Sequence, residues 1–417
     1  MTNTFYDVIQ DFTKKISCHP NSIVILMKAL LESHNEALLR HNKFLEEECE
    51  KSGASYTIPQ VMIRTWRKIQ RELEELSLAT DLVPRNYIIS LISQYDAYLG
   101  LLIKTIFLVK PESLNIIKKE IKLEEILSYD SIENLKLRYI ELQIEEILRR
   151  NHNDQLVWLE EILNTKLRDL ANYSTFIEIT ERRNLFVHCN GVVSSQYLKT
   201  CRKHDYKWRE EPIINEELKV TPKYFFESYS VIFEIGVKLG HVIWRKLLPD
   251  EIETADNSLN SIIYLLIENE DYDLAIELSS FILNIKPVRS TQENILTFLV
   301  NKAQCYKWKD EDDKVNEIVV SIDWSAVKLK YQIARAVLID DYNTASMLMR
   351  NLGNDQNEIT QDAYMEWPLF KEFRKSEEFK ASYYELFGNT VEVQDEVLPI
   401  DSNSSIIGFS SDTELVL

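Results

Sequence analysis

Near the start of this 417-residue chain, mostly apolar residues recur at alternating spacings of three and four. The first stretch contains Val24, Met27, Leu31, His34, Leu38, His41 and Leu45, and the second contains Met62, Trp66, Ile69, Leu73 and Leu76. Only a helical period brings such positions to one face, so each stretch must be a helix if its apolar residues are to be buried together. Gly53 and Pro59 separate the two stretches. We therefore expect a helical hairpin that forms an N-terminal arm over residues 1–80.

The remainder of the chain also favours helices. Only 8 glycines and 10 prolines occur in 417 residues, which is few for a protein rich in turns. The predicted helices are Arg85–Val109, Leu123–Leu127, Ser131–Arg150, Leu156–Leu170, one ending near Gly191, and Pro222–Leu248. We expect an all-α fold with a central helical domain over residues 81–250.

Beyond residue 250 the chain repeats itself. Asp271-Tyr272 is followed by Ala275, and Asp341-Tyr342 followed by Ala345 returns 70 positions later. Twice 35 residues is typical of helix-pair repeats of the tetratricopeptide kind, in which a small residue lets paired helices approach. The middle unit, Leu299–Ile322, fits this period loosely. We expect helical repeats over residues 251–390, serving as a protein-binding groove or as a stabilising cap, and a disordered Ser- and acid-rich tail over residues 391–417.

The net charge, the apolar runs and the cysteines limit where the protein is expected to act and what it is expected to bind. The net charge of −19 argues against a general nucleic-acid binder. The longest apolar run, Ala97–Val109, is interrupted by Lys104, and the first residues lack a signal-peptide pattern. The five cysteines are scattered without a C-x-x-C pair. These features predict a cytoplasmic protein with reduced thiols and no membrane segment.

One region departs from the acidic average. Between Glu181 and Arg209 the chain has seven basic residues and two acidic ones, a local charge of +5. The basic residues are Arg182, Arg183, Lys199, Arg202, Lys203, Lys207 and Arg209. The segment is either a solvated face or an anion-binding surface.

Several common catalytic motifs are missing. The sequence has no G-x-x-x-x-G-K-[ST] loop, G-x-G-x-x-G fingerprint, H-E-x-x-H pair, G-x-S-x-G elbow or Cys/His cluster with zinc spacing. A kinase, dehydrogenase, zinc hydrolase or esterase is therefore disfavoured, and we expect no cofactor and no metal.

The helix that ends near Gly191 carries charge in an unusual place. Phe176, Ile179 and Val187 fall within about 80° of one another, which predicts a buried stripe, and Arg183 falls in its middle. A guanidinium keeps its charge and must find an anion, within the chain or at an interface. Along the flank lie Glu181, Asn184 and His188. A fixed cation one turn from a titratable imidazole suggests phosphate chemistry.

Metal-free RNA cleavage needs these groups. An imidazole can move protons at the attacking and leaving oxygens, and a guanidinium can neutralise charge growing on the phosphoryl group. Asn184 can hydrogen-bond the ring or a phosphate oxygen, and Glu181 can hold the far nitrogen of His188. Arg183 and His188 are about 140° apart on an ideal helix, so two copies packed together would aim both groups better than one. Cys189 points away from His188 and is expected to be buried and inert.

The stretch as a whole resembles the HEPN superfamily of helical ribonuclease domains. The residues that carry the resemblance are Phe176-x-Glu178-Ile179-x-Glu181-Arg182-Arg183-Asn184-Leu185-x-Val187-His188-x-x-Gly191-x-Val193-x-x-x-Tyr197-Leu198. It covers roughly residues 85–248. The resemblance implies a homodimeric, metal-independent endoribonuclease of toxin–antitoxin or antiviral systems, with its site at the dimer interface. Cys189 stands where relatives more often have Asn.

The resemblance also assigns roles by position. It makes Arg183, Asn184 and His188 catalytic, with Glu181 and Tyr197 in support. RNA would be bound by Arg182, Lys199, Arg202, Lys203, Lys207 and Arg209, while a protein regulator or antitoxin would bind the C-terminal repeats. The alternative is a non-catalytic interaction protein, in which the repeats are the working surface and the HEPN-like domain is a dimerisation or nucleotide-binding scaffold.

Overall fold

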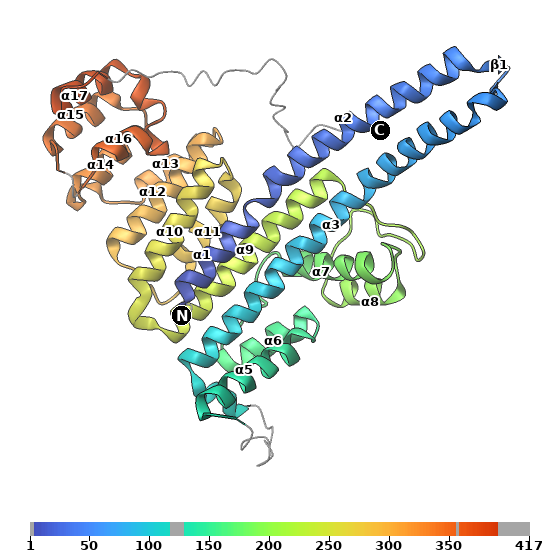
Figure 1. Cartoon of the computed structure of the whole chain (residues 1–417). Coiled ribbons are helices and arrows are strands. Elements are labelled where there is room, and N and C mark those ends of the chain that lie inside the picture. The colour runs from blue at the N-terminus through green and yellow to red at the C-terminus, as the bar shows by residue number, and fades with distance from the viewer. Residues whose placement is uncertain (1–3, 117–128, 356–357, 391–417) are drawn as a thin grey trace. The chain divides into compact units, whose positions relative to one another are not determined.

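The computed structural model describes residues 4–116, 129–355 and 358–390, and they are predominantly helical (Figure 1). The chain divides into two compact units, Met1–Leu247 and Leu248–Leu417. The expectation of an all-α fold is confirmed, since the one sheet in the described residues is the two-stranded hairpin of β1 (Glu50–Ser52) and β2 (Ser55–Thr57). The helix predicted over residues 123–127 and the tail over 391–417 lie outside the described residues.

The N-terminal unit is built around one very long helix, α3 (Ile63–Val109). The other helices of the unit are α1 (Phe5–Ile16), α2 (His19–Glu48), α5 (Ile132–Leu148), α6 (His152–Leu163), α7 (Tyr173–His188), α8 (Ser195–Lys203) and α9 (Pro222–Leu247). Helices α2 and α3 run side by side as a hairpin closed by the small sheet, and α3 then continues into the bundle, where it packs against α1, α5, α7 and α9 (Figure 1).

Helix α3 does not end where the sequence predicted a boundary. The predicted division between residues 80 and 81 lies inside it, and Pro84 is an interior residue. A proline inside a helix removes one backbone hydrogen bond and crowds the preceding turn. Here that loss is outweighed by burial of the following turns, in which Ile88, Leu91 and Ile92 are fully covered.

By length and composition, α3 is the one helix in the described part of the chain that could cross a membrane. Of its most apolar window, 56% is buried inside the fold. Such burial is the pattern of a core helix in a soluble protein.

The first helix, α1, was not predicted from the sequence. A capping box formed by Thr4 and Asp7 starts it, and it buries one apolar face that includes Phe5, Ile9 and Phe12. The Phe12 ring stacks on Tyr98 of α3 with a centroid distance of 4.1 Å. On α9, Gly236 faces the same ring, and a Cβ atom there would overlap it. The absent side chain at Gly236 therefore lets α9 close on α1.

One buried histidine makes the N-terminal unit sensitive to acid. His241 of α9 is fully buried, and neither ring nitrogen has a hydrogen-bond partner among the described residues. Burial, together with nearby Arg245, holds the pKa of His241 well below its usual value. Below about pH 6.5, His241 therefore binds a proton in the unfolded chain but not in the folded one. We expect the free energy of unfolding to fall by about 1.4 kcal/mol for each pH unit below about 6.5.

The His241→Phe variant should lose this part of the pH dependence. The measurement is urea unfolding at pH 7, 6 and 5 for both proteins. His19 and His204 also have lowered pKa values. They are present in both proteins, so their effect on the change of stability with pH cancels when the variant is compared with the wild type. Equal slopes for variant and wild type would contradict the prediction.

The C-terminal unit stacks pairs of short helices. They are α10 (Ile252–Glu268), α11 (Tyr272–Asn284), α12 (Gln292–Trp308), α13 (Asp312–Val320), α14 (Leu329–Leu338), α15 (Tyr342–Leu352), α16 (Gln361–Glu366) and α17 (Glu377–Phe387). Within the pairs, α10 packs on α11, α12 on α13 and α14 on α15, while α11 and α12 join neighbouring pairs. Helix α17 packs on α15 and closes this end of the core.

The two helices of each of these three pairs are joined by the same kind of turn. The residues with positive φ are Glu270, Asp310 and Asp340, at 62°, 57° and 58°. The next N–H in each turn donates to a carbonyl five residues earlier, at 2.8 to 2.9 Å, which closes the first helix of the pair. The three turns are 40 and 30 residues apart rather than 35 each, which explains why the middle unit fitted the predicted period loosely.

Candidate functional site

Helix α7 (Tyr173–His188) carries the predicted residues Arg183, Asn184 and His188 on its last two turns. Residues 176–180 are buried on every side, because α3, α6, α8 and α9 all contact this helix. Val187, His188 and Cys189 at the C-terminal end are exposed. The prediction that Val187 belongs to a buried stripe was therefore wrong, as was burial of Cys189. The period was read along the whole helix, whereas on the last turn the fold covers Leu185 and Phe186 but leaves Val187 and His188 exposed.

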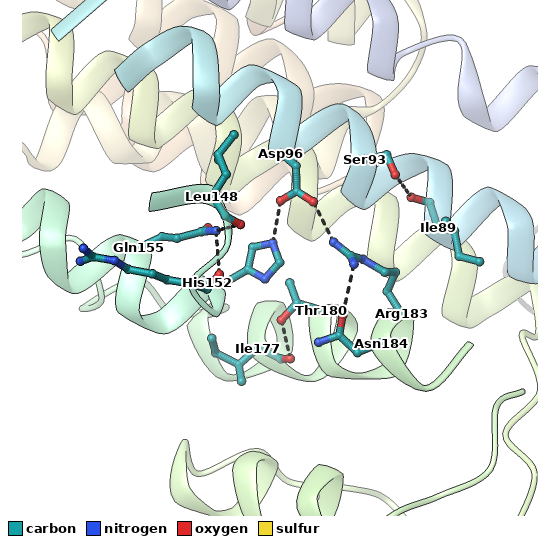
Figure 2. Close-up of polar contacts among 11 residues, drawn as sticks. Ile89, Ser93, Asp96, Leu148, His152, Gln155, Ile177, Thr180, Arg183 and Asn184 are labelled. Atoms are coloured by element: carbon teal, nitrogen blue, oxygen red, sulfur yellow. Dashed lines mark hydrogen bonds and ion pairs between the residues drawn. The ribbon is translucent and has the colours of Figure 1, made fainter. Parts of the chain in front are cut away.

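Arg183 finds its anion within the chain. Its Nη2 donates to Oδ2 of Asp96, on α3, at 2.7 Å (Figure 2). The other oxygen of Asp96, Oδ1, lies 2.9 Å from Nε2 of His152, at the start of α6. The Arg183 and His152 side chains keep 19% and 8% of their exposure. Three helices therefore meet at one carboxylate, and the guanidinium is held at the edge of the bundle.

Two further predicted residues lie beside this contact. Nη1 of Arg183 donates to Oδ1 of Asn184 at 3.2 Å, so the Asn184 amide helps to hold the guanidinium in place (Figure 2). Burial raises the pKa of Glu181, although His152 and Arg183 oppose that shift. Within the described residues, Glu181 forms no hydrogen bond with His188, so the suggested contact between them is not made in the single chain.

Asp96 and His152 were not identified from the sequence. They lie 87 and 31 residues before Arg183 and belong to no local motif. The one available signal was Asp96 itself, an acidic residue in the apolar run of the expected helix Arg85–Val109. A carboxylate in such a run must find a cation, but its partner could not be named without the fold.

The end of α7 is fixed by a buried arginine. The helix ends near Gly191, as predicted; this glycine has a φ of 80°, and its N–H donates to the carbonyl of Leu185 at 3.0 Å. Arg85 of α3 donates to the carbonyl of Asn190 and, at 2.6 Å, to Glu217. These bonds tie the segment after His188 to the core helix, so the exposed imidazole stands on a rigid support.

A second polar cluster occupies another face of α7. Glu178 is fully buried and pairs with Arg182 at 2.7 Å. The hydroxyls of Tyr197 and Tyr224 donate to the same carboxylate at 2.7 and 2.9 Å, and Arg182 lies 3.9 Å from the centroid of the Tyr224 ring. The structure thus places Arg182 and Tyr197 inside the bundle and away from Arg183, where they join α7 to α8 and α9.

The other predicted RNA-binding residues lie on the surface. Arg202 forms an ion pair with Glu211, and the remaining four have no ion pair among the described residues. Those four are Lys199, Lys203, Lys207 and Arg209, all exposed. They belong to a unit whose charge is balanced, since residues 1–247 contain 34 basic and 35 acidic residues, whereas residues 248–417 contain 14 and 32. Nearly all of the acidic excess therefore belongs to the C-terminal unit.

Comparison with known protein families, curated proteins and solved structures finds no match for this chain. Within the ranges that the structure describes, no group of three or more His, Cys, Asp or Glu side chains has an arrangement that could hold a metal ion. At the end of α7 lie an exposed imidazole (His188), a guanidinium held by Asp96 (Arg183) and an amide (Asn184).

Proposed function

We propose that this protein is a metal-independent endoribonuclease whose site is completed by two copies of the chain. The observation that supports this most directly is the grouping of Arg183, Asn184 and His188 toward the exposed end of α7, with Arg183 braced by Asp96. Arg183 is a fixed cation held by Asp96, and His188 is an exposed imidazole five residues later on the same helix, a combination that fits phosphoryl chemistry.

In the proposed reaction the ribose 2′-oxygen forms a bond to its own phosphorus, and the bond from phosphorus to the 5′-oxygen breaks. The 2′-hydroxyl proton passes to a base, and the leaving 5′-oxygen takes up a proton, which leaves a cyclic phosphate and a 5′-hydroxyl. His188 carries out proton transfer, because an exposed imidazole has one ring nitrogen that can donate a proton and one that can accept it. Arg183 neutralises charge on the phosphoryl oxygens, and Asn184 holds the guanidinium or a phosphate oxygen.

A site shared by two copies fits the directions of Arg183 and His188 better than a site within one chain. Arg183 and His188 are about 140° apart around an ideal helix, so one chain does not readily direct both at a single phosphate. If the last turns of two α7 helices face each other, Arg183 of one copy and His188 of the other can approach the same substrate. The exposed cations Lys199, Lys203, Lys207 and Arg209 would attract RNA to this face.

Replacing either proposed catalytic residue should abolish RNA cleavage. We expect His188→Ala and Arg183→Ala to lower the cleavage rate at least about 100-fold, the usual scale for losing general acid–base or oxyanion assistance. Purified protein is incubated with total RNA and EDTA, and fragments with cyclic phosphate ends are counted. Matched controls are His34→Ala and Arg138→Ala, which alter residues of the same types elsewhere. Undiminished cleavage by the double variant would refute the proposal.

The second candidate is a non-catalytic interaction protein that uses its C-terminal helix pairs. Its support is the acidic excess of that unit and the ion pairs that link successive turns, Lys307 with Asp340 at 2.7 Å and Lys309 with Asp273. Under the first function, the helix pairs would act as tetratricopeptide-like repeats that bind a protein regulator, in a cytoplasmic toxin or antiviral system. Under the second, they would be the working surface, and the N-terminal unit would serve for dimerisation or nucleotide binding. RNA that remains intact in the assay above, for wild type as well as variants, would favour this second function.

A further inference from the structure

Two adjacent isoleucines are exposed on a tight turn close to the proposed site. Ile213 and Ile214 retain 72% and 53% of their accessible surface, on the loop between α8 and α9. Their neighbours in sequence are acidic, namely Glu210, Glu211, Glu216 and Glu217. A single exposed apolar side chain is ordinary, but a contiguous apolar feature rimmed by charge marks a binding surface.

The turn is held in shape by its own hydrogen bonds. The N–H of Ile213 donates to Oε2 of Glu216 at 2.9 Å, and the N–H of Glu216 donates back to the carbonyl of Ile213 at 3.1 Å. Asn215 adopts a φ of 72°, which bends the chain between them. The two isoleucines are therefore presented to solvent by an ordered structure, so binding loses little conformational entropy.

The same turn is bonded to the segment that follows His188. Val193 exchanges backbone hydrogen bonds with Glu216 and Asn215, at 2.8 and 3.0 Å, and the N–H of Leu218 donates to the carbonyl of Gly191. Val192 and Glu217 form a β-bridge. Val187, on the last turn of α7, is itself 46% exposed. The exposed apolar residues and the exposed imidazole thus belong to one rigid portion of the unit.

The charge around the turn indicates what kind of molecule binds there. Glu211 and Glu217 are already ion-paired with Arg202 and Arg85, which leaves Glu210 and Glu216 beside the two isoleucines. An exposed apolar pair offers a phosphate nothing to bind, so the occupant is a protein. A cationic surface that complements these glutamates exists on the same chain, at Lys199 and Lys203 of α8, and Arg202 of α8 already pairs with Glu211. In a two-fold interface each copy offers both halves of such a pair, so neighbouring patches of opposite charge can serve self-association.

We infer that Ile213 and Ile214 are the apolar anchor through which two copies of this chain associate, bringing the ends of their α7 helices together. The inference rests on the proposed function in one respect: the proposed site is incomplete in a single chain and needs a partner copy at this place. In protein interfaces a few buried apolar residues usually supply most of the binding energy, and a polar or charged rim surrounds them.

The test compares the full-length wild type with the Ile213→Ser/Ile214→Ser protein by sedimentation velocity over a range of concentrations. The dissociation constant of the dimer is expected to rise at least about 30-fold, on the scale of losing two interface anchors. Cleavage of RNA should fall in parallel at low protein concentration and recover as the protein concentration is raised. The matched control is Ile25→Ser/Leu39→Ser, which removes two apolar residues of α2 that are 70% and 69% exposed and lie outside this turn.

Circular dichroism melting identifies a folding defect, and Ile213→Thr with Ile214→Thr offers a milder pair if the serine protein is unstable. A wild-type protein that is monomeric at micromolar concentration, or a variant that dimerises like wild type, would overturn the inference. If dimerisation is lost as expected while even the wild type cleaves no RNA, the interface stands and the proposed function fails. If cleavage is lost without any change in dimerisation, the interface fails and the function stands.

Discussion

Mixing the Arg183→Ala and His188→Ala proteins should restore RNA cleavage to about a quarter of the wild-type rate. Each variant alone is inactive, because every site in its dimer lacks one of the two groups. After random exchange of copies, about half of the dimers contain one chain of each kind, and each of these has one of its two composite sites intact. The measurement is the initial rate of RNA cleavage after the two proteins are mixed and allowed to exchange.

The control mixes Arg183→Ala with a protein that carries both substitutions, so that no intact composite site can form. This mixture should remain inactive at every ratio. No activity in either mixture, while the wild type cleaves RNA, would show that Arg183 and His188 of the same chain act together. Equal activity in both mixtures would show cleavage that does not need Arg183. The result therefore decides between a composite site and a site within one chain, independently of how the copies are held.

Removing the charge of Glu178 should destabilise the N-terminal unit by about 3 to 5 kcal/mol, because Arg182 is then left buried without an anion. Glu178 is fully buried, and Arg182 keeps 11% of its side-chain exposure. The substitution Glu178→Gln preserves the shape and removes the charge. The free energy of unfolding is measured with urea, and the activity of the remaining folded protein should be unchanged because this cluster does not contact Arg183 or His188.

The chain offers a closely matched control in Glu145→Gln. Glu145 and Arg149 form the same kind of pair, four residues apart on one helix, but with 54% and 81% of their side chains exposed. That substitution should cost less than about 1 kcal/mol, because water already solvates both groups. A second control replaces Glu178 and Arg182 together by Met, which removes both charges and should cost less than Glu178→Gln alone. Equal losses in the two glutamate variants would contradict the buried-charge argument.

Much of the fold was predictable because helical periods are local. The long helices α2, α5 and α9 coincide closely with predicted apolar patterns. Helices α3 and α9 end at Val109 and Leu247, shortly before Pro111 and Pro249. Helix α1 was missed although the sequence carries its signal, a Thr4–Asp7 capping box before apolar residues at helical spacing. The course of α3 through Pro84 was not predictable, because tertiary burial overrides the local preference of proline.

The site was predictable only where it is local. Arg183, Asn184 and His188 share one helix, so their relative directions follow from the 3.6-residue period. The partner of Arg183 could not be foreseen, since Asp96 and His152 come from two other helices. The burial expected for Val187 was wrong for a related reason, because a period shows which residues share a face and not how far the neighbouring helices extend along it.

The unbroken course of α3 has a mechanical consequence. Its first half forms one side of the hairpin with α2, and its second half carries both Arg85 and Asp96. A helix without a joint transmits rotation and tilt along its length, whereas a loop would absorb them. The hairpin and the carboxylate that holds Arg183 are therefore parts of one helix, so a displacement of the hairpin tip near Gly53 would be passed to Asp96.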